Sequence, residues 1–246
     1  LLPAVTALVQ KPDQYSGAFV FVAMLFYAFE LYCDFTGGID ITIGIAESMG
    51  IKLAENFNLP YFSKNIKEYW NRWHITMGTW FTDYIFYPIS VCGPMLKLSK
   101  WSRAHLGEVI GKRVPVYLSS FAVWLTTGIW HGAAWNFIVW GLYFGGIIML
   151  EKYYIFKREK PLSPWLQHLY SLFLIVFGWA IFYFNDFSRL GRFIVTLFGF
   201  AGGGFSDAAS TSLLTSNFFL LIVGIICCLP TAKYVKYIFD ALMRAN

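Results

Sequence analysis

The stretch that decides the fold is VPVYLSSFAVWLTTGIWHGAAWNFIVWGLYFGGIIML, residues 114–150, which contains no Lys, Arg, Asp or Glu. As one straight helix it would be about 55 Å long, against about 30 Å of hydrocarbon in a bilayer. We therefore expect 114–150 to form a helical hairpin that carries His131, with its break in IWHGAAW beside Gly132. Both flanks, 95–113 and 151–160, are rich in basic residues, which predicts that both outer ends lie in the cytoplasm.

The amino-acid composition also fits a membrane environment. The chain has 246 residues, of which 57% are hydrophobic and only 13% charged. These values exclude a disordered chain and argue against an ordinary water-soluble enzyme. The net charge of +5 is carried by basic residues between apolar runs, so we interpret them as loop anchors at a membrane and expect no nucleic-acid partner. The sequence predicts an all-α, multi-pass transmembrane protein of the cytoplasmic (inner) membrane, with short, broken and re-entrant helices.

Other segments support this organisation. Apolar runs at 14–29, 166–184 and 213–232 are further candidate spans. Residues 35–51 alternate Gly, Thr and Ile with two acids, which predicts a glycine-broken helix inside a bundle. Residues 185–216 are predicted to form a loop. The start of the chain lacks a basic segment before an apolar stretch, so we expect no signal peptide.

Segment 52–80 is predicted to be amphipathic, lying on the membrane surface or re-entering from it. Ile66, Trp70, Trp73 and Met77 would share one face of a helix that starts near Lys64 with Ser63 as its cap. The basic residues Lys64, Lys67 and Arg72, with Lys52, lie among aromatic residues that include Trp70. This patch suits an anionic group of an acyl donor, such as a phosphopantetheine or nucleotide, and equally suits lipid headgroups.

Two histidines and one carboxylate are candidates for chemistry. His131 lies inside the longest uncharged stretch, where a titratable group is costly and indicates function. The alternative is a neutral imidazole bonded to a backbone carbonyl. His74, after Arg72 and Trp73, is a candidate whose alternative is a structural role at the membrane interface. Asp34, close to two glycines, is either part of a polar network or a contact that holds helices together.

Four motifs in order resemble the membrane-bound O-acyltransferases, in particular the bacterial branch that acts on alginate and teichoic acids. They are the Asp-Phe-small-Gly opening from Asp34 to Gly37, ENFN-x-P-Y from Glu55 to Tyr61, the segment from Glu68 to Ile75 that contains Trp-His-Ile, and Trp-His-Gly-Ala-x-Trp from Trp130 to Trp135. The resemblance covers roughly residues 30–150. Family members are longer, so we expect a C-terminal portion of one membrane domain, 1–246, that lacks N-terminal helices.

The resemblance implies a fold around a central tunnel and acyl transfer from a cytoplasmic thioester, acetyl-CoA or a carrier-protein thioester, to a hydroxyl. His131 matches the proposed catalytic histidine and His74 the second one. Asn56, Trp130 and Trp135 fall within the matching motifs and are candidate substrate-binding residues. No bound cofactor or metal is expected. The expected partners are membrane lipid, an extracytoplasmic acetyltransferase and a polysaccharide acceptor.

If His131 is the general base, an oxyanion donor is also required, and either His74 or a backbone N–H would serve. A non-enzymatic transporter or flippase subunit of an export system is the main alternative, because broken helices and an intramembrane histidine suit both. A third reading makes His74 and His131 ligands of a haem or a metal, although no cluster of Cys, His or carboxylates surrounds them in the sequence.

Overall fold

The computed structural model describes residues 15–155, 162–201, 204 and 206–228. Within these ranges the regular elements are helical, apart from one isolated antiparallel bridge between Phe57 and Trp73. The predicted all-α class is therefore confirmed. The chain divides into two compact units, one formed by 1–53 with 186–246 and the other by 54–185.

The first unit is organised around one long helix, α2 (Gly17–Ser48), which contacts α10 (Phe187–Leu197), α11 (Ala208–Ser216) and α12 (Phe218–Cys228). Ser16 begins α2 by accepting a hydrogen bond from the N–H of Phe19 at 3.4 Å, as an N-cap does. Gly17 permits close packing against α10, because a Cβ there would lie 2.6 Å from the carbonyl oxygen of Leu197.

Two expectations for this unit are wrong. The glycine-rich segment 35–51 is not broken, because α2 runs through Gly37, Gly38 and Gly44 to Ser48. Each glycine costs a helix about 1 kcal/mol relative to alanine but keeps its backbone N–H, so glycines alone do not end it. The segment 185–216 contains α10 and α11 instead of a continuous loop. The buried residues Leu190, Phe193 and Leu197 of α10 follow the spacing of one helical face.

The second unit holds both candidate histidines. In chain order it comprises the 3-10 turn η2 (Pro60–Phe62), α3 (Ile66–Arg72), α4 (Ile75–Phe81), the π-helical turn η3 (Thr82–Phe86), α5 (Tyr87–Val91), α6 (Gly93–Gly111), α7 (Val114–His131), α8 (Trp135–Leu150), the π-helical turn η4 (Glu151–Ile155) and α9 (Pro164–Tyr183). Among the described helices, α2 and α9 are long and apolar enough to cross a membrane.

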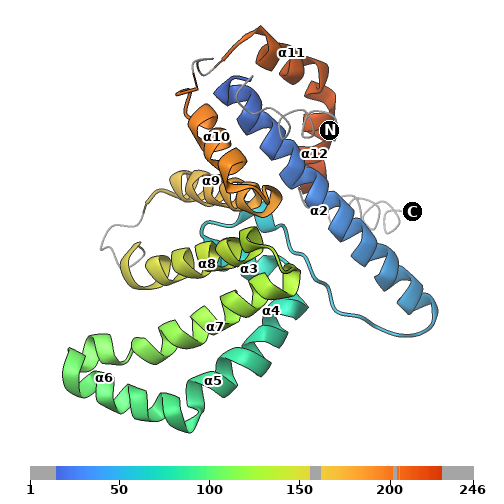
Figure 1. The fold of residues 1–246 in the computed structure, drawn as a ribbon. Helices are drawn as coiled ribbons and strands as arrows, with labels where there is room; N and C mark the ends of the chain where they lie inside the picture. The colour runs from blue at the N-terminus through green and yellow to red at the C-terminus, as the bar shows by residue number, and fades with distance from the viewer. Residues whose placement is uncertain (1–14, 156–161, 202–203, 205, 229–246) are drawn as a thin grey trace. The chain divides into compact units, whose positions relative to one another are not determined.

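Helices α7 and α8 lie side by side (Figure 1) and form the centre of this unit. Gly132 joins them with a φ of 153°, a backbone conformation that residues other than glycine rarely adopt. Small residues allow the two helices to approach closely: a Cβ on Gly128 would lie 2.6 Å from the carbonyl oxygen of Phe137, and one on Gly141 would collide with that of Trp124. The sequence break beside His131 is thus a tight interhelical turn.

Segment 52–80 differs in detail from the expected single amphipathic helix. Its first helix is capped by Asn65, whose Oδ1 accepts from the N–H of Glu68 at 2.7 Å, and not by Ser63. The helix ends at Arg72, and His74 adopts the left-handed conformation at φ 47 and ψ 55. Met77 therefore lies on a separate helix, α4, and does not continue the face of Ile66.

Candidate active site

Asn56 and His74 are brought together by backbone pairing around the turn between α3 and α4. The N–H of Ile75 donates to the carbonyl of Asn56 at 3.0 Å, and the N–H of Asn58 donates to the carbonyl of Arg72 at 2.9 Å. Phe57 and Trp73 form the bridge between these two contacts. This arrangement sets the buried side chain of Asn56 against the imidazole of His74.

The hydrogen bonds of Asn56 define the tautomer of His74. Asn56 Oδ1 lies 3.1 Å from the backbone N of Thr76, which can only donate, and 2.6 Å from Thr76 Oγ1. The atom facing them is therefore an acceptor. The same oxygen lies 3.1 Å from Nδ1 of His74, so that nitrogen must donate. In the neutral ring the lone pair is then on Nε2.

Burial lowers the pKa of His74 below its ordinary value near 6.5. At neutral pH the ring is consequently uncharged, and its Nε2 accepts a hydrogen instead of donating one. This bears on the expectation that His74 supplies the oxyanion donor, because a neutral His74 already uses its single N–H on Asn56. The tautomer favours a role as acceptor or base.

His131 is the last residue of α7 and is half-buried among aromatic rings. Its ring centroid lies 4.9 Å from that of Trp140 and 5.2 Å from that of Phe182, both in edge-to-face geometry. Asn136 fixes this wall by donating from Nδ2 to the carbonyl of Phe182 at 2.7 Å. Trp140 and Asn136 were not singled out in the sequence, because they look like ordinary residues of an apolar helix.

The fold brings His74 and His131 into one neighbourhood although they are far apart in the sequence. Trp130 lies between them, with its ring centroid 4.7 Å from that of His131 and 6.4 Å from that of His74. Trp130 is 58% exposed, so one side of this group remains open within the second unit.

A cavity of about 690 Å³ adjoins His74. It is bordered by residues of α3, α4, η3, α5, α7 and α8, including Lys67, Trp70, Asp83 and Thr127. His131 is not among its lining residues. The cavity thus combines aromatic walls with one cation, one carboxylate and the His74 imidazole. Asp83, an exposed residue of the π-helical turn η3 that borders the cavity, was not expected from the sequence, because such turns have no simple sequence signal.

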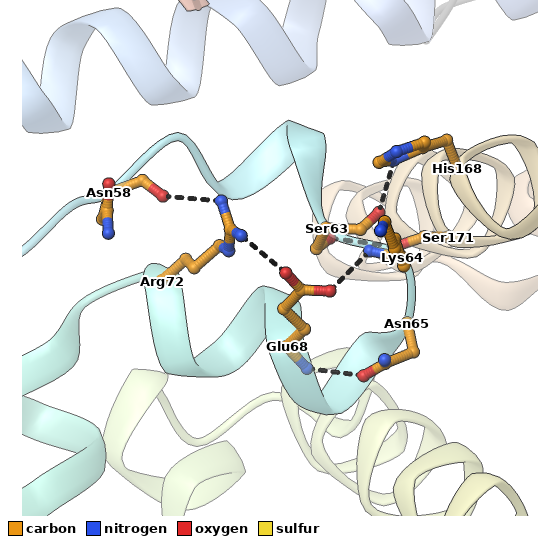
Figure 2. A network of polar contacts seen from close by, with 8 residues as sticks. All are labelled: Asn58, Ser63, Lys64, Asn65, Glu68, Arg72, His168 and Ser171. Atoms are coloured by element: carbon orange, nitrogen blue, oxygen red, sulfur yellow. Dashed lines mark hydrogen bonds and ion pairs between the residues drawn. The ribbon is translucent and has the colours of Figure 1, made fainter. Parts of the chain in front are cut away.

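The basic patch divides into residues with different surroundings (Figure 2). Arg72 forms an ion pair with Glu68 at 2.6 Å, and the other carboxylate oxygen of Glu68 accepts from the backbone N–H of Lys64 at 2.8 Å. Arg72 also donates to the carbonyl of Asn58 at 3.4 Å. Arg72 therefore stabilises the turn around α3, whereas Lys67 lines the cavity.

Glu151 is a buried structural residue that the sequence analysis missed. It is 2% exposed and accepts hydrogen bonds from the N–H groups of Ile66 at 2.8 Å and Lys67 at 3.1 Å. Burial raises its pKa, and these two bonds act in the opposite direction. By binding the first N–H groups of α3, Glu151 ties the α8 end to the helix that carries Lys67.

The remaining predicted residues lie elsewhere. Asp34 is exposed on α2, which belongs to the first unit. Trp135 is 69% exposed at the start of α8 and does not line the cavity beside His74. Among the residues that the structure describes, no three His, Cys, Asp or Glu side chains are grouped closely enough to hold a metal ion.

An all-helical chain with apolar helices of bilayer length and two neighbouring imidazoles is typical of a membrane-embedded enzyme. The chain belongs to the membrane-bound O-acyltransferase family, whose model matches residues 6–192. It is therefore an integral membrane protein.

Named relatives support this assignment. The chain is 33% identical to the "probable alginate O-acetylase" of Azotobacter vinelandii over 82% of its length, and 31% identical to the peptidoglycan O-acetyltransferase of Helicobacter pylori over 85%. It is 35% identical to the teichoic acid D-alanyltransferase of Bacillus subtilis over 57%. The matches cover 38%, 38% and 32% of these relatives, so the chain spans about a third of their length.

Proposed function

We propose that this chain is part of a membrane-bound O-acyltransferase of the cytoplasmic membrane, with His131 as general base. It transfers an acyl group, acetyl in our proposal, from acetyl-CoA or a carrier-protein thioester toward a hydroxyl of an exported polysaccharide. The observation that carries the proposal is that the Trp130 ring neighbours both His74 and His131, and that His74 lines a cavity whose lining includes the cation of Lys67. Family membership favours this function over a transporter or flippase subunit.

The proposed reaction needs one base and one source of positive potential. His131 takes the proton from the acceptor hydroxyl while the hydroxyl oxygen attacks the thioester carbonyl. The tetrahedral intermediate collapses, the carbon–sulfur bond breaks, and the thiolate takes the proton back from His131. The products are the ester and the free thiol. Exclusion of water matters because hydrolysis of the thioester would waste the donor.

The oxyanion donor in this proposal is a backbone N–H. Neutral His74 donates its single N–H to Asn56, so it has no hydrogen on Nε2 for the oxyanion. The first turn of α8 begins four residues after His131. The N–H of Phe137 in this turn donates to the carbonyl of Ala134 at 3.3 Å, and the N–H groups of Trp135 and Asn136 precede this first bond of the helix. These groups provide partial positive charge next to the proposed base. His74 then acts as a hydrogen-bond acceptor on the cavity side.

The donor is proposed to enter the cavity that His74 lines. Its aromatic walls suit the apolar part of a pantetheine arm, and Lys67 suits a phosphate. Acetyl is proposed because the matches to the two acetyl-transferring relatives extend over 82% and 85% of the chain, against 57% for the D-alanyl relative. Transfer through an extracytoplasmic acetyltransferase to the polysaccharide completes the proposal.

The decisive experiment compares transfer from radiolabelled acetyl-CoA with transfer from a D-alanyl carrier protein, using membranes that contain the protein or its His131→Ala variant. We expect label from acetyl-CoA to reach polysaccharide in membranes that contain the unaltered protein and not in those that contain His131→Ala. Equal labelling by both membranes would overturn the role of His131, and labelling by the D-alanyl carrier alone would overturn the choice of acetyl.

A further inference from the structure

A second cavity lies along the α7–α8 hairpin and differs in character from the one beside His74. It measures about 430 Å³ and is lined by apolar or small side chains. Leu118 and Phe121 contribute from α7, while Leu142, Gly146 and Met149 contribute from α8. We call this cavity the hairpin groove. In a protein that belongs to a membrane-bound family, an apolar groove of this kind is suited to a hydrocarbon chain.

One end of the hairpin groove meets a cluster of basic and aromatic residues. Tyr117 lines the groove and contacts Tyr153 edge to face, with ring centroids 5.1 Å apart. The guanidinium of Arg113 lies 4.7 Å from the centroid of the Tyr153 ring, and Lys152 Nζ lies 5.3 Å from it. Tyrosines and basic residues together are typical of the level of lipid headgroups.

The charges of this cluster are available for an external anion. Among the described residues, neither Arg113 nor Lys152 takes part in an ion pair, whereas the neighbouring Lys112 is paired with Glu108 at 3.1 Å. The nearby carboxylate of Glu151 is buried and accepts hydrogen bonds from Ile66 and Lys67. Arg113 also immediately precedes α7, an 18-residue helix whose N-terminal end carries partial positive charge.

We propose that the hairpin groove and the Arg113–Lys152 cluster form a binding site for one anionic phospholipid. An acyl chain would lie in the groove between α7 and α8, and its phosphate would lie between Arg113 and Lys152. The site is separate from the patch around Lys64, and it does not depend on the acyl-transfer activity. It shares Ser120 and Trp124 with the cavity beside His74, so a bound lipid would support the wall that separates the two spaces.

The structure provides separate variants for the two halves of this site. Gly146→Leu places a branched side chain in the lining of the groove, at a position where no atom lies within 4 Å of a built Cβ. Gly44→Leu is its matched control, since a Cβ on this α2 residue also meets nothing within 4 Å. Arg113→Gln with Lys152→Gln removes the cationic end. Lys97→Gln with Lys100→Gln removes the same charge elsewhere.

The test uses the protein reconstituted into bilayers of equal parts phosphatidylglycerol and phosphatidylcholine with matched acyl chains. The protein is then extracted in mild detergent, and native mass spectrometry counts the lipids that stay bound. We expect one retained phosphatidylglycerol per chain. The Arg113/Lys152 double variant should lose its preference for phosphatidylglycerol by about thirtyfold, because each basic residue near a headgroup contributes roughly a factor of five. Gly146→Leu should lose the retained lipid, and both controls should keep it.

Other outcomes overturn the proposal. No retained lipid, or equal retention of both lipids by the unaltered protein, would exclude a specific anionic site. Retention that survives Gly146→Leu would exclude the groove. A preference that survives the loss of Arg113 and Lys152 would exclude the headgroup position. Because the readout is bound lipid, failure here leaves the proposed acyl transfer unaffected.

Discussion

Replacement of Asn56 by alanine tests whether this side chain positions His74. Asn56 Oδ1 accepts from His74 Nδ1 and from the N–H and hydroxyl of Thr76. A hydrogen bond contributes about 1 kcal/mol net, and exposed Thr76 can bond to water instead, so we expect a stability loss of about 1–2 kcal/mol. Loss of the bond that holds the His74 tautomer should reduce the transfer rate about tenfold at neutral pH.

The aspartate variant distinguishes a role of Asn56 in setting the protonation of His74 from a purely structural role. Asn56→Asp keeps an oxygen that accepts the same three hydrogen bonds, but its negative charge should raise the pKa of His74. In the unaltered protein the pKa of His74 is lowered from 6.5. Activity that requires neutral His74 should therefore persist as the pH falls to this lowered pKa, and should be lost at a pH below it. In Asn56→Asp the loss should begin at a higher pH.

The assay is acyl transfer in membrane vesicles across a series of pH values, with the thermal midpoint of each purified variant measured in detergent. Asn58→Ala is the matched control, because Asn58 lies on the same loop and its described contacts use only backbone atoms. It should retain nearly full activity. A native rate in Asn56→Ala, or an unshifted acidic limb in Asn56→Asp, would refute the positioning argument.

Three further variants test other parts of the site. His131→Ala should abolish transfer while membrane insertion, judged by fractionation, stays normal; substantial residual transfer would remove His131 from the role of base. Lys67→Gln should raise the apparent KM for the thioester donor several-fold, whereas Lys64→Gln, whose side chain does not line the cavity, should not; equal effects would assign both lysines to general membrane attraction. Gly141→Ala should lower stability by about 1–3 kcal/mol in a thermal melt, because its Cβ meets the Trp124 carbonyl, whereas Gly146→Ala, which meets nothing, should be neutral or stabilising.

The sequence by itself determined the membrane class, the all-α fold and the break beside His131. These properties are local. An apolar run longer than a bilayer is thick must turn, and Gly132, next to the single histidine of the run, tolerates backbone conformations that other residues avoid. The motifs around His74 and His131 also carry the family resemblance.

Only the tertiary structure decided how these residues act on one another. The left-handed turn at His74, its bond to Asn56 and the position of Trp130 between the two imidazoles depend on contacts between distant segments. The different roles of Lys67 and Arg72 also depend on tertiary contacts. Both are basic residues of the short helix α3, but Lys67 lines the cavity and Arg72 forms an ion pair with Glu68. The partners of a side chain from distant segments are decided by how the helices pack. The spacing of residues along the chain does not reveal these partners.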